Sequence, residues 1–249
     1  MGSPIQHGPR RIVVIGPGRL GSAIARALAA RGEHVVGPLG RRDPRPTFDD
    51  HDVVLLCVPD DAVATVAADV QPGPFVGHTA GALSLDALGN HRAFSIHPLL
   101  AVVDGFAGFD GAACAIAGRD SEALAVARDI ATRLGMEPIA VDDRLRPLYH
   151  AAASMASNYL VTIEDAAERI GSAAGVERRH LARLARSALE NWERSGAASL
   201  TGPISRGDEA TVTRQRDAVA RGAPAVLPLW DALADATREL AARSRESGR

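Results

Sequence analysis

The chain has 249 residues, which is long enough for two domains that each bury an apolar core. Its 46% hydrophobic content and formal net charge of −2 are ordinary for a globular protein, and they exclude the overall basic excess typical of nucleic-acid binding. The sequence contains no lysine, which excludes a P-loop, a Schiff-base lysine and a lysine proton donor.

The cysteines and the apolar runs point to an ordinary cytoplasmic protein. Cys57 and Cys114 lie in separate apolar runs and share no motif, so we expect buried thiols, with neither a disulfide nor a metal site. No apolar run is long enough to cross a bilayer, and the polar segment 1–11 lacks the apolar region of a signal peptide. We therefore expect no membrane or nucleic-acid partner.

The first predicted strand leads into a glycine-rich turn. The apolar run 12–15 is followed by Gly16, Gly18 and Gly21, and a predicted helix covers 22–30. Between a strand and a helix, the spacing GxGxxG is typical of a dinucleotide-binding turn. The first glycine permits the turn, the second allows a pyrophosphate to approach the backbone, and the third allows the helix to pack closely on the strand. The alternative is a glycine turn that serves packing alone. We assign the whole turn to a cofactor: Gly16, Gly18, Arg19, Leu20 and Gly21.

The second predicted strand, 34–39, indicates which cofactor. Gly40, Arg41 and Arg42 follow it, where an NAD-binding protein usually has an acid for the ribose 2′-hydroxyl. Two guanidinium groups suit a 2′-phosphate, so Arg41 and Arg42 predict NADP. Asp43 is close enough in sequence to keep NAD as an alternative.

Five further runs complete a predicted sheet: 53–58, 75–78, 93–97, 112–117 and 138–141. Because they are almost continuously apolar, we expect strands buried on both faces of a mostly parallel sheet, with a helix at 121–134 in the covering layer. Ligands of such sheets bind beyond the carboxyl ends of the strands, which selects Val58, Pro59, Thr79, Gly81 and His97. The alternative is that Pro59-Asp60 and His97-Pro98 are turns and that Asp60 caps a helix.

Strand signals stop after residue 143. Helices are predicted at 145–170, 180–192, 209–220 and 224–243, and the second of these carries a broad apolar stripe. The predicted fold class is therefore a doubly wound α/β Rossmann domain, residues 1–143, followed by an all-α domain, residues 144–249.

Two groups in the helical half are candidates for chemistry. His150, Ser154 and Asn158 recur every four residues, so we expect them on one helix face, where histidine donates a proton and the other two orient a substrate oxygen. The alternative is a solvated helix face. Arg206 lies near glycines, where it is suited to bind a substrate carboxylate, unless this segment is only a turn in which Asp208 caps the next helix.

Several motifs, taken together, resemble a known superfamily: Gly16-Pro17-Gly18-Arg19-Leu20-Gly21, Val58-Pro59-Asp60, His78-Thr79-Ala80-Gly81, His97-Pro98, Tyr149-His150 with Asn158, and Thr201-Gly202-Pro203 with Arg206-Gly207-Asp208. The chain resembles β-hydroxyacid dehydrogenases, 6-phosphogluconate dehydrogenase and pyrroline-5-carboxylate reductase. It more closely resembles proteins that join a Rossmann-like domain to the helical domain of unknown function 2520.

The resemblance implies roles for individual residues and a departure from the family pattern. In the β-hydroxyacid dehydrogenases a catalytic lysine lies one turn before an asparagine, whereas this chain has His150 at the lysine-like place and Ser154 and Asn158 one and two turns on. The resemblance also implies a homodimer that pairs through the helical domain.

Three classes of function follow from these observations. The first is an NADP-dependent reductase of a small, carboxylate-bearing 2-oxo acid, with His150 as acid and His97 and Arg206 on the substrate. The resemblance implies 2-dehydropantoate as one such substrate. The second is an imine reductase of the pyrroline-5-carboxylate type, which needs less from an acid when its substrate is already protonated. The third is a non-catalytic NADP sensor or interaction protein.

Overall fold

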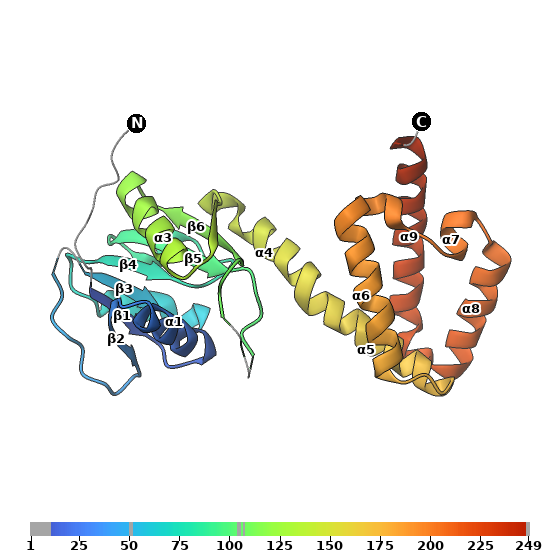
Figure 1. Cartoon of the computed structure of the whole chain (residues 1–249), viewed down its shortest axis with the longest axis horizontal. Helices are drawn as coiled ribbons and strands as arrows, with labels where there is room; N and C mark the ends of the chain where they lie inside the picture. The colour runs from blue at the N-terminus through green and yellow to red at the C-terminus, as the bar shows by residue number, and fades with distance from the viewer. Residues whose placement is uncertain (1–10, 50–51, 104–105, 107, 248–249) are drawn as a thin grey trace. The chain divides into compact units, whose positions relative to one another are not determined.

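The computed structural model describes residues 11–49, 52–103, 106 and 108–247, and the chain divides into two compact units, Met1–Ser154 and Met155–Arg249 (Figure 1). Each unit is described by itself. No helix among the described residues is both long and apolar enough to cross a membrane. Within the same part of the chain, no cluster of histidine, cysteine and acidic side chains suits a metal ion.

The first unit is built on a seven-stranded sheet in the order β2-β1-β3-β4-β5-β6-β7. All neighbouring strands are parallel except β5 and β6, which confirms the expected mostly parallel sheet. The strands are β1 (Arg11–Ile15), β2 (His34–Leu39), β3 (Val53–Leu56), β4 (Phe75–His78), β5 (Arg92–Pro98), β6 (Ala113–Gly118) and β7 (Glu137–Ala140).

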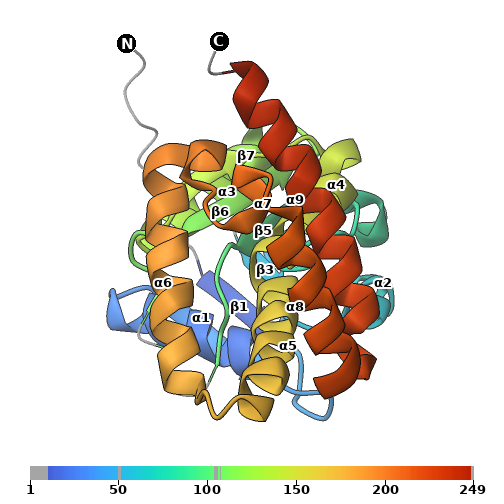
Figure 2. The same ribbon diagram turned by 90° about the vertical axis from the view of Figure 1, so that its right-hand side faces the viewer.

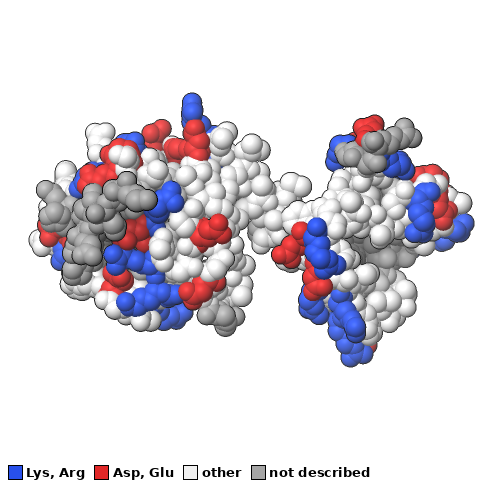
Figure 3. Space-filling model, turned by 45° about the horizontal axis from the view of Figure 1, so that its top comes forward, with Lys and Arg blue, Asp and Glu red and all other residues white. Residues whose placement is uncertain are grey.

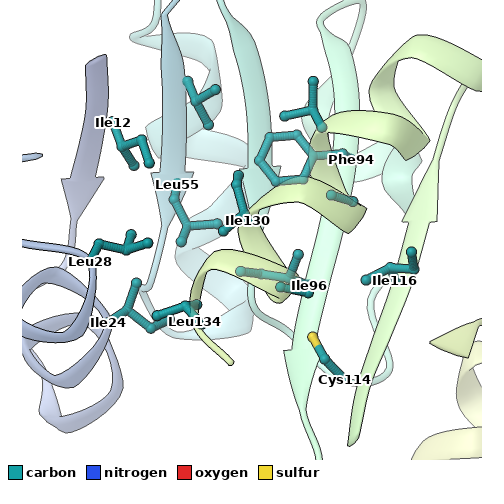
Figure 4. Close-up of a cluster of buried hydrophobic side chains, with 14 of the residues drawn as sticks. Ile12, Ile24, Leu28, Leu55, Phe94, Ile96, Cys114, Ile116, Ile130 and Leu134 are labelled. Atoms are coloured by element: carbon teal, nitrogen blue, oxygen red, sulfur yellow. The ribbon is translucent and has the colours of Figure 1, made fainter. Parts of the chain in front are cut away.

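Two apolar clusters cover the two faces of this sheet. On one face, α1 (Arg19–Ala30) and α3 (Ser121–Arg133) place Leu28 and Ile130 against alternate strand residues such as Leu55 and Phe94 (Figure 4). On the other face, α2 (Asp60–Ala68) and the short 3-10 helix Leu85–Leu88 cover the remaining strand residues. The layers are therefore helix, sheet and helix, as in a Rossmann domain.

The outermost strands differ from the prediction of strands buried on both faces. The central strands β1, β3 and β4 are almost entirely buried, whereas β2 and β7 have only half-buried and exposed residues. Each of these two strands lies at an edge of the sheet and has a neighbouring strand on one side only, so its residues are less covered than those of the central strands.

The second unit contains only helices among its described residues. After α5 (Leu160–Ala173) come α6 (Arg178–Ser195), α7 (Pro203–Arg206), α8 (Glu209–Gly222) and α9 (Leu227–Ser247), with 3-10 turns at Gly196–Ser199 and Pro224–Val226. Helix α5 packs against α6 and α8, and α7 packs against both α8 and α9 (Figure 2). This confirms the all-α class of the second half.

The long helix expected at 145–170 is not a uniform α-helix. A 3-10 turn at Asp143–Leu145 leads into α4 (Arg146–Ser154), and a π-helical segment, Met155–Tyr159, separates α4 from α5. The division between the compact units falls after Ser154, later than the predicted boundary at 143/144. It falls there because α4 is anchored in the first unit by Arg146, which is completely buried.

Candidate active site

The three glycines of the turn between β1 and α1 have different tasks. Gly16 has a φ of 114°, and a Cβ there would lie 2.2 Å from the carbonyl oxygen of Cys57. A Cβ on Gly21 would lie 2.1 Å from the carbonyl oxygen of Gly16. Gly18 is exposed, and a Cβ there would meet no atom within 4 Å. The fold itself therefore requires Gly16 and Gly21, whereas the open space beside Gly18 suits an approaching ligand.

Helix α1 begins earlier than the predicted residue 22. Gly18 is its N-cap, and no side chain caps the helix there, so the first N–H groups of α1 have no side-chain partner. Arg19 is exposed and Leu20 is half-buried at this end. Uncapped N–H groups and the helix dipole together favour an anion such as a pyrophosphate.

Arg41 and Arg42 follow β2 with exposed side chains. The carboxylate of Asp43 accepts a hydrogen bond from the backbone N–H of Gly40 at 2.7 Å. Asp43, which kept NAD as an alternative, is thus engaged in stabilising its own turn. The exposed cations are the groups at this turn that suit a 2′-phosphate.

The carboxyl ends of the parallel strands lie level with one another. The register pairs Ile15 with Leu56 and Leu56 with His78, and the N–H of Cys57 donates to the carbonyl of Ile15 at 2.7 Å. Val58 and Pro59 after β3, and Thr79 and Gly81 after β4, therefore emerge at the same edge as the glycine turn. Asp60 is the first residue of α2 and its cap is Pro59, so the alternative role of Asp60 as a helix cap is wrong.

Three ring side chains gather at the ends of β4 and β5. His97 of β5 shares a hydrogen bond of 2.7 Å between its Nδ1 and the phenolic oxygen of Tyr149 on α4. The rings of His97 and His150 have centroids 5.6 Å apart in an edge-to-face arrangement. A Cβ on Gly81 would lie 2.2 Å from Cδ2 of His150 and 2.9 Å from Nε2 of His97, so glycine permits this close approach. The structure therefore brings Gly81, His97 and His150 together.

Burial determines the protonation states of His97 and Tyr149. Desolvation, with smaller effects of His150 and Arg146, lowers the pKa of His97 to about 4, so its imidazole is neutral near pH 7. Desolvation raises the pKa of Tyr149 to about 12, which keeps the phenol protonated. A phenol that donates to Nδ1 leaves the proton of neutral His97 on Nε2, the nitrogen nearer Gly81.

The predicted stripe of polar residues spaced by four ends where α4 ends. His150 and Ser154 are half-buried on one face of α4, as predicted. Asn158 is exposed and belongs to the π-helical segment of the second unit, where the longer turn breaks the regular α spacing. The prediction of one continuous stripe over His150, Ser154 and Asn158 is therefore corrected at Asn158.

The predicted carboxylate-binding arginine also lies in the second unit. Arg206 was expected in a loop, but it is the exposed last residue of the short helix α7. The helix ends there because the next residue, Gly207, has a φ of 72°. Asp208 caps α8, with its carboxylate accepting from the N–H of Thr211 at 3.0 Å, as the alternative interpretation held.

Comparison with known proteins identifies the family. Residues 112–237 match the family described as domain of unknown function DUF2520. The chain belongs to the DUF2520 family. No curated protein matches the sequence significantly.

Solved structures share the fold of this DUF2520 protein over nearly its whole length. A Thermotoga maritima protein is 23% identical, with 94% of this chain and 99% of that chain covered and a TM-score of 0.75. A Bacteroides fragilis protein assigned as an NADP oxidoreductase is 18% identical, with 92% and 98% covered and a TM-score of 0.78. A Plasmodium falciparum pyrroline carboxylate reductase with NADP bound is 12% identical, with 93% and 98% covered and a TM-score of 0.57. The chain thus has the fold of NADP-dependent oxidoreductases.

Sequence reasoning gave no role to two residues of the cluster. Arg146 is completely buried, and its guanidinium donates to Oγ of Ser95 at 2.8 Å and to the carbonyl of Ala80. Tyr149 contacts His97 from the next turn of α4. Arg146 could have been recognised from its position in the sequence, because it precedes His150 by four residues and so extends the same polar stripe by one helical turn.

Substitution of the glycines separates packing from binding. Gly21→Ala should lower the free energy of unfolding by about 1–3 kcal/mol or more, because its Cβ collides with backbone. Gly18→Ala should change stability by less than about 1 kcal/mol and weaken NADPH binding at least about tenfold, since the new methyl group occupies the open space. Denaturant unfolding and calorimetric NADPH titration measure the two effects. Parental NADPH affinity in Gly18→Ala would contradict a cofactor at this turn.

Proposed function

We propose that this chain is an NADP-dependent reductase that transfers hydride to the carbonyl carbon of a small 2-oxo acid. The observation that carries the proposal is the common edge of one parallel sheet. The glycine turn, the Arg41-Arg42 turn and the cluster of His97, Tyr149 and His150 all follow the strands at that edge or pack against it. Cofactor-binding and proton-handling groups are thus held by one rigid element.

The cofactor would be held by residues of the first unit. The N-terminus of α1 and the open space at Gly18 suit the pyrophosphate, and Arg41 and Arg42 suit the 2′-phosphate. Val58 and Pro59 follow β3, and Thr79 and Gly81 follow β4; these two strands lie between β1 and β5 in the sheet, so all four residues would lie beside the cofactor. When bound, NADPH supplies the hydride.

The side chains of the cluster have separate tasks in the proposed reaction. Neutral His97, oriented by Tyr149, presents an N–H to the substrate oxygen and polarises the carbonyl. His150 supplies the proton that the developing alkoxide requires, and Ser154 orients the oxygen. Asn158 is proposed to orient the substrate, and Arg206 is proposed to bind its carboxylate. Both roles are supported by residue type and sequence spacing alone.

An imine reductase is the second candidate function. Because the pKa of His97 is lowered to about 4, its imidazole is neutral near pH 7 and does not repel a substrate that arrives as an iminium ion, which needs no proton donor. The pyrroline carboxylate reductase of the same fold is consistent with this chemistry. The two candidates differ in the charge of the group that accepts the hydride.

A panel assay tests the proposal and its alternatives. Purified protein with NADPH is incubated with 2-oxo acids, including 2-dehydropantoate, and with cyclic imines, while NADPH absorbance is followed. Turnover of oxo acids supports the proposal, and turnover of imines alone supports the second candidate. NADPH binding without any turnover would indicate a non-catalytic sensor.

Removal of both turn arginines tests the choice of cofactor. Arg41→Ala/Arg42→Ala should weaken NADPH binding at least about tenfold and leave NADH binding nearly unchanged, because each charged contact to a phosphate contributes roughly 1.5–3 kcal/mol. Calorimetric titration measures both affinities. The control, Arg26→Ala/Arg128→Ala, removes the same charge from exposed helix positions and should bind both cofactors as the parent does. Equal loss for NADPH and NADH would contradict the assignment.

Replacement of His150 tests the proton donor. His150→Ala should lower turnover by about 10² to 10⁴ while NADPH affinity is unchanged, because the residue acts in the chemical step. The losses in His97→Ala and His150→Ala should not add in the double variant, since the two rings act on one substrate oxygen. Circular dichroism verifies the fold of each variant. Parental turnover in folded His150→Ala would exclude it as the acid.

We also propose that the protein is a two-fold homodimer formed through the second unit. Helix α6 has no buried residue, and its exposed side chains include Leu184, Leu189 and Trp192. Figure 3 shows broad uncharged surface on this unit, with charged side chains gathered toward its margins. An apolar face of this kind is typical of an interface between subunits.

A charged residue in this face should prevent dimerisation. Light scattering at micromolar concentration should report a dimer for the parent and a monomer for Leu184→Asp, because the carboxylate would be buried without a partner. Arg186→Asp places a carboxylate two residues from Leu184, at an exposed position on a different face of α6, and should remain dimeric. A monomeric parent would overturn the proposal.

A further inference from the structure

Arg146 is a buried cation without an ion pair. Its side chain has no exposed surface, and no acid among the described residues forms an ion pair with it. Its two bonded nitrogens donate to Ser95 and Ala80, and Nε has no hydrogen-bond partner within the described part of the chain. An apolar side chain would satisfy the core at lower cost, so the charge calls for an explanation other than packing.

Asp143, the acid with the largest effect on the pKa of Arg146, is already engaged. The carboxylate of Asp143 accepts from Oγ of Ser84 at 2.7 Å and from the backbone N–H of Leu85 at 3.1 Å. Desolvation lowers the pKa of Arg146, while Asp143 and more weakly Asp60 act in the opposite direction. The guanidinium therefore remains a positive charge whose field is only partly compensated.

Arg146 occupies the same face of α4 as the other cluster residues. Tyr149 and His150 follow it by three and four residues, and this spacing aligns all three side chains on one helix face. The bonds to Ser95 of β5 and to the carbonyl after β4 fix the start of α4 on the sheet edge. They thereby hold Tyr149 against His97.

His78 and His97, which lie near Arg146, add no positive charge of their own near pH 7. Desolvation, followed by the charge of Arg146, lowers the pKa of His78 to about 4, and His97 has a similarly low value. His78 is completely buried, and both of its ring nitrogens lack hydrogen-bond partners among the described residues. The fixed cation of Arg146 thus lies among the neutral imidazoles of His78 and His97.

We propose that Arg146 is a positioning residue that also determines the substrate class, favouring a carbonyl compound over an iminium ion. This inference rests on the proposed reductase function. When hydride from NADPH adds to a carbonyl carbon, the π electrons move to oxygen, and the alkoxide then takes a proton from His150. A fixed cation behind the cluster stabilises that developing negative charge. An iminium ion enters with a positive charge that the same cation repels, and hydride addition neutralises it.

The first test measures the charge effect without any substrate. Ring-proton NMR titration of Arg146→Met should show the pKa of His78 moving from about 4 toward the ordinary 6.5, with a smaller rise for His97. Arg146→Lys retains the charge and should keep both values low. Arg144→Met, a change at an exposed arginine two residues away, should leave both unchanged. Unchanged histidine pKa values in Arg146→Met would overturn the electrostatic role.

The second test measures specificity with two carboxylates of equal carbon number, 2-oxopentanoate and pyrroline-5-carboxylate. In Arg146→Met the ratio of kcat/KM for the oxo acid to that for the imine should fall at least about tenfold, which corresponds to about 1.4 kcal/mol, while NADPH affinity is unchanged. Arg144→Met should keep the parental ratio. An unchanged ratio in an active Arg146→Met enzyme would overturn the specificity role.

A conservative pair keeps the inference testable if Arg146→Met fails to fold. Arg146→Lys retains charge without the two-pronged donor geometry, and Ser95→Ala removes one of the two hydrogen bonds without removing charge. Both should lower kcat and keep the substrate ratio and the low pKa of His78. A shifted ratio in either variant would show that geometry and not charge selects the substrate. A parent that reduces neither compound would overturn the proposed function, and this inference with it.

Discussion

Parallel pairing of four adjacent strands is the constraint on which the rest of the structure depends. Since β1, β3, β4 and β5 run in the same direction, their carboxyl ends meet at one edge, and residues far apart in sequence become neighbours there. Strand β6 runs antiparallel to β5, so its carboxyl end lies at the opposite edge of the sheet. A chain with these residues on strands of alternating direction would distribute them over two edges, and no single ligand would reach them.

Burial is the second organising principle, because it fixes charge as well as position. At the end of β5, desolvation keeps His97 neutral and Tyr149 protonated, while the guanidinium of Arg146 keeps its charge. The three groups thus hold defined protonation states without a network of ion pairs. These three groups therefore change little in charge across neutral pH.

The sequence predicted those features that depend on local pattern. Near-continuous apolar runs located all seven strands to within a few residues, and the glycine spacing located the turn before α1. His150 and Ser154 fall on one face of α4 because that segment is a regular helix. The burial of Arg146 was not predictable in the same way, since it depends on contacts with β4 and β5, which are distant in sequence. Asn158 was misplaced because apolar and polar periodicity cannot reveal a π-helical segment.

The unequal tasks of the three turn glycines have an evolutionary consequence. Mutation of Gly16 or Gly21 damages the domain itself, so selection for folding alone is enough to retain both. Gly18 is free of such pressure, and only a bound ligand gives a reason to keep it. In a descendant that bound no ligand at this turn, the outer glycines would persist while the middle one changed. Among descendants of this chain, the middle glycine is therefore the informative marker of retained binding.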